Sequence, residues 1–417
     1  MNYLKVKISL FINYFVFALL LNSVGTVILQ VQRTYGVSES AASVLEAFKD
    51  LSIAGISFLV ASFLTRIGYK KAMLVGLSAT AAICLVMPSL DSFWGTKLLF
   101  LVIGLSFGLI KVSVFSTMGL VTSDQKEHIS LMSFIESFFM IGILSGYFIF
   151  TAFIDESNPS AWLRVYYWLA GLCVLAFVLL WSTPLDESAV KPEESRPMVE
   201  EFAEMFRLII LPLVMVFVGC VFFYVLIEQS IMSWLPTFNN KVLKLPATLS
   251  IQMASILAIS TAVGRFLSGI LVQRINWLYL LLGCLLLAGG LVLITIPLAQ
   301  QASGATITGW TDAPLAAFVF PIIGLLIAPI YPTINSLILS KLPVRQHGTM
   351  SGLIVVFSAL GGTTGSIITG HIFEAYGGET AFYFSLVPMT LLMVLLFFYR
   401  KLQGGDSKVT ITATGGH

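Results

Sequence analysis

Seven ionisable residues interrupt the long apolar stretches of this chain. They are Glu46, Lys49, Asp50, Lys111, Glu136, Glu228 and Arg265. A charge at membrane depth costs roughly 2.5–3.5 kcal/mol on insertion scales, so such residues persist where they face a cavity or an opposite charge. A carboxylate in a cavity can also carry protons, because desolvation favours its neutral form and a neighbouring cation favours its charged form. Proton transfer and the binding of a polar ligand are therefore the chemistry that these residues can support.

Three of these residues share one face of one predicted helix. Glu46, Lys49 and Asp50 stand at positions i, i+3 and i+4, a spacing that aligns side chains along a helix. We predict that they form a polar cluster with Lys111 and Glu136 on the N-terminal wall of a cavity. Glu46 and Glu136 are the first candidates for proton coupling, and Asp50 is the third. The alternative is a static network of ion pairs that holds the helices together.

Candidate ligand-binding residues occur in both halves of the chain. Lys111, near the middle of its apolar stretch, is the candidate for an anionic group, which an ammonium attracts strongly at low dielectric. Glu228 and Gln229, expected towards the outer half of their helix, can hydrogen-bond hydroxyl groups. The other candidates are polar or aromatic residues suited to a hydroxyl-bearing ligand: Asn22, Gln30, Tyr331 and Asn335. Each of these residues can instead serve helix packing.

The sequence lacks the patterns of an enzyme or of an ATP-driven pump. No run of residues resembles a nucleotide-binding glycine loop. The four histidines stand apart, with neither metal-ligand spacing nor a nucleophile beside them: His128, His347, His371 and His417. The net charge of +2 gives no indication of a nucleic-acid partner. We therefore expect no catalytic residue, no metal and no cofactor, with protons as the coupling ion and a small molecule as the ligand.

The elements that carry these residues must lie in a lipid bilayer. Of 417 residues, 57% are hydrophobic and 11% are charged, against about 25% charged in soluble domains. The mean hydropathy is +0.94. Twelve apolar runs are long enough to cross a bilayer. They are residues 7–32, 40–64, 71–90, 97–122, 130–154, 162–183, 207–236, 246–272, 277–298, 313–340, 349–375 and 379–400.

The twelve spans divide into two halves. We predict an all-α membrane protein in which residues 1–183 and 207–402 form two pseudo-symmetric six-helix bundles. The hydrophilic residues 184–206 form a connector, and residues 403–417 form a disordered tail. If the N-terminus is cytoplasmic, inside segments hold fifteen Lys and Arg residues and outside segments hold five. This asymmetry indicates that both termini and the connector are cytoplasmic. We expect a monomer in the inner membrane.

Short motifs in both halves resemble those of a known superfamily. The basic turn Thr65 to Lys71 resembles the helix 2–3 signature of the major facilitator superfamily, with Thr65 and Tyr69 in place of the usual acid and arginine. Three further segments resemble the helix 7, 8 and 10 elements of its fucose:proton symporter family: Tyr224 to Leu235, Ala262 to Leu267, and Tyr331 to Ile334.

This resemblance implies proton-driven uptake of a sugar or sugar derivative by alternating access, from a site between the two bundles. It implies gating or structural roles for Arg66, Gly68, Gly264 and Arg265. That family often carries acids in helices 1 and 4, whereas residues 22–25 here hold no carboxylate and Lys111 stands at about the second position. A sugar acid therefore joins the neutral hexoses as an expected substrate.

Two other functions remain open. One is an efflux antiporter for drugs or metabolites, although such exporters typically carry a Gly-Pro-rich element in helix 5, and residues 140–146 contain no proline. The other is a non-transporting membrane sensor or receptor. The short predicted loops, apart from the connector, provide no appended domain that relays a signal.

Overall fold

The computed structural model describes residues 4–61, 64–121, 125–187, 207–272, 274–300, 309–339, 341 and 347–404. These residues are almost entirely helical, and the β-pairing among them is one isolated bridge between Asp155 and Asn158. The predicted connector therefore lies mostly outside the described residues, as does the predicted tail.

The first half of the chain, called the N-half, contains eight labelled α-helices and a 3-10 turn. They are α1 (Leu4–Leu21), α2 (Val24–Tyr35), α3 (Glu39–Ala61), α4 (Leu64–Ile67), α5 (Tyr69–Leu90), α6 (Phe93–Val121), α7 (Gln125–Thr151), η1 (Ala161–Arg164) and α8 (Val165–Ser182).

The second half, called the C-half, contains two more 3-10 turns. Its elements are α10 (Pro212–Lys241), α11 (Ala247–Leu271), α12 (Trp277–Gln300), η2 (Trp310–Asp312), α13 (Leu315–Val319), η3 (Phe320–Ile322), α14 (Ile323–Ile327), α15 (Ile330–Leu339), α16 (His347–Tyr376), α17 (Gly378–Tyr383) and α18 (Leu386–Gly404).

These elements make up the predicted helical membrane fold. Ten spans in the described residues are long and apolar enough to cross a membrane, and α7 contains a shorter apolar helix, Phe138–Thr151. The charged helix α3, with 23 residues, fills the place of the second predicted span. Some spans are broken, since α1 and α2 together make the span Leu4–Tyr35, and α13 to α15 lie within Leu315–Ile338.

The seventh span is displaced from its predicted position. The sequence predicts residues 207–236, whereas α10 runs from Pro212 to Lys241. Leu211 has an extended backbone with ψ 125°, and proline follows at the first helical position, where its missing N–H costs nothing. Glu228 therefore lies near the middle of α10 and not towards its outer half.

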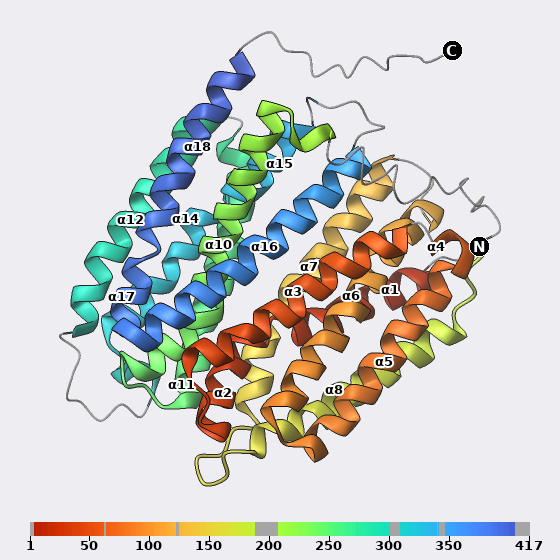
Figure 1. Ribbon diagram of the computed structural model, residues 1–417. Coiled ribbons are helices and arrows are strands. Elements are labelled where there is room, and N and C mark those ends of the chain that lie inside the picture. The colour runs from red at the N-terminus through yellow and green to blue at the C-terminus, as the bar shows by residue number, and fades with distance from the viewer. Residues whose placement is uncertain are drawn as a thin grey trace.

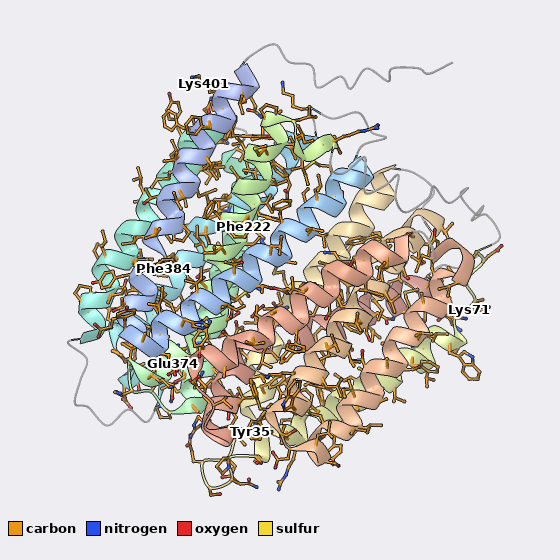
Figure 2. The ribbon with its side chains drawn as sticks, viewed as in Figure 1. Tyr35, Lys71, Phe222, Glu374, Phe384 and Lys401 are labelled. Carbon is orange, nitrogen blue, oxygen red and sulfur yellow. The ribbon has the colours of Figure 1, made fainter. Side chains whose placement is uncertain are left out.

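Apolar side chains project from the outer helices, as Figure 2 shows for the whole molecule. Phe266 and Tyr279 are each 73% exposed and Phe397 is 63% exposed. Large apolar groups on an outer surface suit lipid. The interior is also apolar, with Trp234, Phe100 and Tyr166 among the largest fully buried side chains.

The two halves meet along α3 and α16, which lie side by side in Figure 1. α10 packs against α2 at the same seam, and α11 packs against α7. We call the side of the molecule that holds Leu4 and Gly404, the outer ends of α1 and α18, the terminal side. The opposite side, which holds Glu39 and Lys241, is called the far side.

Close approach of α11 and α14 depends on Gly264. A Cβ atom at this position would lie 2.5 Å from the backbone oxygen of Leu325 and 2.8 Å from Cβ of Ala328. Both distances are too short for van der Waals contact, so the helices would have to separate. The predicted structural role of Gly264 thus has a packing basis within the C-half.

We expect Gly264→Ala to lower the free energy of unfolding by about 1–3 kcal/mol, the usual effect of overpacking. Gly283→Ala in α12 is the matched control, since its Cβ meets no atom within 4 Å. Thermal unfolding of both variants in detergent measures the difference. Equal melting temperatures for the two variants would show that the α11–α14 contact adjusts without cost.

Candidate functional site

A cavity of about 310 Å³ lies between the halves. Its wall carries one acid and one base from each half. Asp50 and Lys111 belong to the N-half, while Glu228 and Arg265 belong to the C-half. Since buried charges are costly without a polar partner, four in one cavity mark it as the candidate ligand site.

The remaining wall combines neutral polar, aromatic and aliphatic side chains. The polar residues are Asn22, Gln229, Thr261 and Ser358, and the aromatic residues are Phe107, Phe139 and Tyr331. Amides and hydroxyls bind hydroxyl groups, and aromatic faces cover apolar ones. A small ligand with both kinds of surface matches this wall.

The three charges of α3 form a compact network. Lys49 forms ion pairs with Glu46, one turn earlier, and with Asp50, at 3.4 Å between Nζ and Oδ1. Glu46 is fully buried and the Asp50 side chain is 13% exposed. Because Asp50 lines the cavity and Glu46 does not, the network runs from the cavity wall into the protein behind it.

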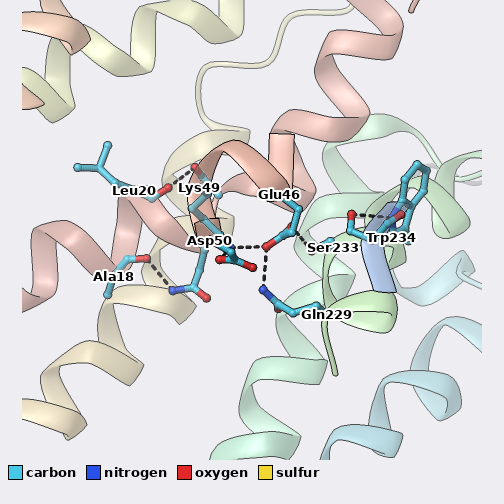
Figure 3. Close-up of polar contacts among 11 residues, drawn as sticks. Ala18, Leu20, Glu46, Lys49, Asp50, Gln229, Ser233 and Trp234 are labelled. Carbon is cyan, nitrogen blue, oxygen red and sulfur yellow. Dashed lines mark hydrogen bonds and ion pairs between the residues drawn. The ribbon is translucent and has the colours of Figure 1, made fainter. Parts of the chain in front are cut away.

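Glu46 also joins the two halves. Its Oε1 accepts a hydrogen bond of 2.7 Å from Nε2 of Gln229, and its Oε2 accepts one of 2.7 Å from the Ser233 hydroxyl. Both donors lie on α10, and Figure 3 shows them pointing at Glu46. The carboxylate therefore binds a cation on its own helix and two neutral donors from the C-half.

Gly362 of α16 allows Asp50 and Gln229 to meet at the cavity wall. A Cβ atom there would lie 2.7 Å from Oδ2 of Asp50 and 3.1 Å from Cγ of Gln229. Glycine thus leaves room for a carboxylate of one half beside an amide of the other.

The charged pair of the C-half has its own partners. The Glu228 carboxylate accepts hydrogen bonds from the Tyr224 hydroxyl at 2.8 Å and from Arg265 at 3.3 Å. The Tyr224 ring lies 5.4 Å from the Tyr331 ring, measured between centroids. The Tyr331 hydroxyl contacts that of Ser358 at 3.4 Å. Arg265, predicted to be a gating residue, lies on the cavity wall.

Lys111 stands on α6 with its ammonium 5.9 Å from the centroid of the Phe107 ring. Its side chain is partly buried and lines the cavity. An ammonium near an aromatic face is stabilised by the ring quadrupole. Lys111 therefore brings a positive charge of the N-half to the wall.

Polar contacts close the far side of this cavity. Lys241 of α10 forms an ion pair with Glu39 at the start of α3, and Glu374 of α16 accepts a hydrogen bond of 3.0 Å from the backbone N–H of Ser40. Each contact joins the C-half to the first turn of α3. The cavity thus lies on the terminal side of a closed barrier.

The predicted site residues differ in where they lie relative to the cavity. Seven line the cavity: Asn22, Asp50, Lys111, Glu228, Gln229, Arg265 and Tyr331. Glu46 lies directly behind the wall. Gln30 and Asn335 are not among the described residues that line it, and Gln30 is 2% exposed with no hydrogen-bond partner for its Nε2. The side chains of Glu136 and Arg66 lie outside the described part of the chain.

Gly68, another of the four residues with a predicted gating or structural role, has a local structural role. Its φ of +90° favours glycine, and it precedes α5. The Glu187 carboxylate accepts a 2.7 Å hydrogen bond from the backbone N–H of Lys70. This places an acid at the start of a helix, where the dipole stabilises it, and ties the turn to the segment after α8.

Two hydrogen-bond partners of the buried carboxylates were not predicted from the sequence. Ser233 binds Glu46, and Tyr224 binds Glu228. Ser233 stands four residues after Gln229, so helical spacing could have placed it on the same face of α10. Nothing in the local sequence indicates that this face meets α3.

The fold and site define a helical membrane protein with a polar cavity between two bundles, as in solute transporters that work by alternating access. The sequence matches the Major Facilitator Superfamily over residues 10–365. The chain therefore belongs to this superfamily, as the sequence motifs indicated. No curated protein sequence matches it.

Solved transporters share the fold at low sequence identity. The xylose transporter XylE from E. coli, in an inward open conformation, has a TM-score of 0.73 at 12% identity, covering 94% of this chain and 95% of XylE. The nucleoside transporter NupG has a TM-score of 0.71 at 15% identity, covering 97% and 100%. The transporter FucP, in the outward conformation, has a TM-score of 0.62 at 15% identity, covering 96% and 99%.

Proposed function

We propose that this chain is a secondary active importer that takes up a sugar or sugar derivative with protons by alternating access. The observation that carries the proposal is the cavity, whose wall combines paired charges, amides and aromatic rings from both halves. Hydroxyl-bearing ligands need such a combination of polar and apolar contacts. XylE is named as a xylose transporter and NupG as a nucleoside transporter, and both ligands are sugars or contain one.

The α3 network supplies the proposed proton pathway. Asp50 can exchange a proton with the cavity, and Glu46 lies behind it, linked through Lys49. Protonation of either carboxylate changes the charge around Lys49. Since Glu46 holds Gln229 and Ser233 across the seam, its protonation weakens a contact between the halves. Proton binding is in this way linked to the alternation of the cavity.

We place the terminal side in the cytoplasm and the protein in the inner membrane. The fifteen-to-five distribution of Lys and Arg supports this orientation. In this orientation the far side is the extracellular side, so the conformation described here has its cavity closed to the outside. Import proceeds when this barrier opens outward, accepts substrate and closes again.

A cysteine at position 188, in the connector, should be protected from an impermeant maleimide added outside intact cells, whereas one at position 311 should react. Thr311 is exposed on the loop between α12 and α13, and Ser188 lies outside the described residues. The native cysteines give little background, since Cys84, Cys173 and Cys220 are buried and Cys284 is partly buried. Labelling of Ser188→Cys from outside would show that the protein has the opposite orientation.

Uptake by cells that express the chain tests the function itself. Radiolabelled hexoses, pentoses and hexuronates are offered with and without a protonophore, and cells with an empty vector are the control. We expect accumulation of at least one sugar, lost when the proton gradient is dissipated. Efflux of sugar, or uptake that is the same with and without the protonophore, would contradict proton-driven import.

A further inference from the structure

The polar groups of the cavity differ between its two ends. Asp50 lies eleven residues from Glu39, and Gln229 lies twelve residues from Lys241, at the far-side ends of α3 and α10. At 1.5 Å per residue these positions are about 16–18 Å deep. Lys111 and Arg265 each lie eighteen residues from the far-side ends of α6 and α11, or about 27 Å deep.

The far-side end of the cavity therefore presents groups that bind hydroxyls. Asp50 is an acceptor that shares the positive charge of Lys49 with Glu46. Gln229 is held beside it by its bond to Glu46, and its amide can accept through the carbonyl oxygen. A carboxylate and an amide side by side, from opposite halves, suit two neighbouring hydroxyl groups of one ligand.

The terminal-side end presents two cations. The Arg265 side chain is 37% exposed, and one of its nitrogens donates to Glu228, which holds the guanidinium in place. A guanidinium has five N–H donors in a planar fork that matches a carboxylate. Lys111 brings the ammonium of the opposite half to the same cavity. The backbone positions at the two ends differ in depth by about 10 Å. The long side chains of Lys111 and Arg265 can span part of this distance.

The negative charges of the cavity do not exclude an anion from this end. Glu228 already accepts from both Tyr224 and Arg265, so its charge is neutralised locally. Asp50 lies at the other end and is paired with Lys49. An anionic group between Arg265 and Lys111 therefore meets two cations and one compensated acid among the described residues.

We propose that the substrate is a monoanionic sugar acid, which binds with its carboxylate between Lys111 and Arg265 and its hydroxyls on Asp50 and Gln229. This inference rests on the proposed sugar transport and specifies the substrate class. Each end of the ligand contacts one residue from each half. The bound ligand therefore links the N-half to the C-half. Lys111 and Arg265 are the residues that determine specificity for an acid over the parent sugar.

The test compares matched ligands on the purified full-length protein. D-glucuronate and D-galacturonate, as sodium salts, are titrated against D-glucose and D-galactose at equal ionic strength, and the melting temperature is recorded. We expect at least one uronate to bind at least tenfold more tightly than its parent hexose. A charge-assisted contact of this type supports such a ratio.

The variants locate the carboxylate. Lys111→Gln and Arg265→Gln should each weaken uronate binding at least tenfold while hexose binding changes less than twofold. Lys97→Gln, in the first turn of the same helix α6 and stacked on Phe93 and Trp94, is the control and should change neither. If Arg265→Gln does not fold, Arg265→Lys keeps the charge without the planar fork and should show a smaller loss.

The outcomes separate the inference from the proposed function. Hexose binding without uronate binding, or equal losses for both ligands in Lys111→Gln, overturns the sugar-acid assignment and leaves sugar transport standing. Absence of any shift with all four ligands overturns the sugar-acid assignment. Citrate is titrated as a fifth, non-sugar ligand, and a shift with citrate but with none of the four sugars overturns both proposals.

Discussion

Glu46→Gln is expected to abolish accumulation driven by a pH gradient while exchange of substrate between equal pools continues. Glutamine keeps the size of the side chain and one oxygen that can accept from Gln229, while its amide nitrogen can only donate, for example to the Ser233 hydroxyl. It cannot take up or release the proton. The substituted side chain lies behind Asp50 and does not line the cavity, and its remaining oxygen can still hold the cavity-lining Gln229. Substrate binding should therefore persist, and the accumulation ratio should fall towards one.

A loss of stability should accompany this change and can be separated from it. Lys49 would retain only Asp50, at 3.4 Å, and breaking a buried pair costs up to about 3–5 kcal/mol. The double variant Glu46→Gln with Lys49→Met removes the cation as well and leaves Asp50, at the cavity wall, as the remaining charge of the three. It should recover the melting temperature but not the accumulation. If the double variant recovered both the melting temperature and the accumulation, Glu46 would serve only as a structural partner of Lys49.

Glu136→Gln is the parallel test, because Glu136 was the other first candidate for proton coupling. If Glu136 carries the proton in place of Glu46, Glu136→Gln is the variant that loses accumulation while exchange is preserved. Counterflow and pH-driven uptake are measured in the same proteoliposomes. If both variants accumulate substrate like the parent, the coupling site must be sought at Asp50 or Glu228.

Gly370→Val is expected to reduce transport to less than about a tenth of the parent rate by keeping the far side open. A Cβ at this position of α16 would lie 2.7 Å from Cβ of Ser43, 2.8 Å from the Trp234 ring and 2.9 Å from the backbone oxygen of Glu39. Two of these groups belong to α3, across the seam. Overpacking a closed contact shifts the balance towards the conformation in which the contact is absent.

Accessibility of Ser43 reports the same effect directly. Ser43 is fully buried in the closed conformation. Ser43→Cys should react with an impermeant maleimide from the far side at least tenfold faster when Gly370→Val is present. Gly290→Val in α12 is the control, since no atom lies within 4 Å of its Cβ. Full transport with Ser43→Cys still protected would show that the seam does not open there.

The fold was largely predictable because its cause is local in the sequence. An apolar run can be recognised from consecutive residues alone, and the twelve predicted spans correspond to the helices observed in the described residues. The seventh span was misplaced by about five residues, because hydropathy continues through Leu211 while the backbone turns before Pro212. The break between α1 and α2, at Asn22 and Ser23, is too short to divide an apolar run of this length.

The contacts of the site were predictable only where both partners lie on the same helix. Spacing placed Glu46, Lys49 and Asp50 on one face of α3, and the ion pairs follow from that spacing. Which of the three faces the cavity depends on α10 and α16, through Gln229 and Gly362. The Glu228–Arg265 pair likewise needs two helices in contact. No pattern within either helix specifies such a contact.

The most direct test of the central claim follows sugar and protons together in proteoliposomes that contain the purified protein. Labelled D-glucuronate and D-glucose are each offered outside at a lower pH than inside, while a trapped dye reports internal pH. We predict that at least one of them accumulates against its gradient and that the interior acidifies in step with uptake. Acidification should be absent from empty liposomes and from Glu46→Gln or Glu136→Gln. Accumulation without proton entry, or proton entry that expels the sugar, would contradict proton-coupled import.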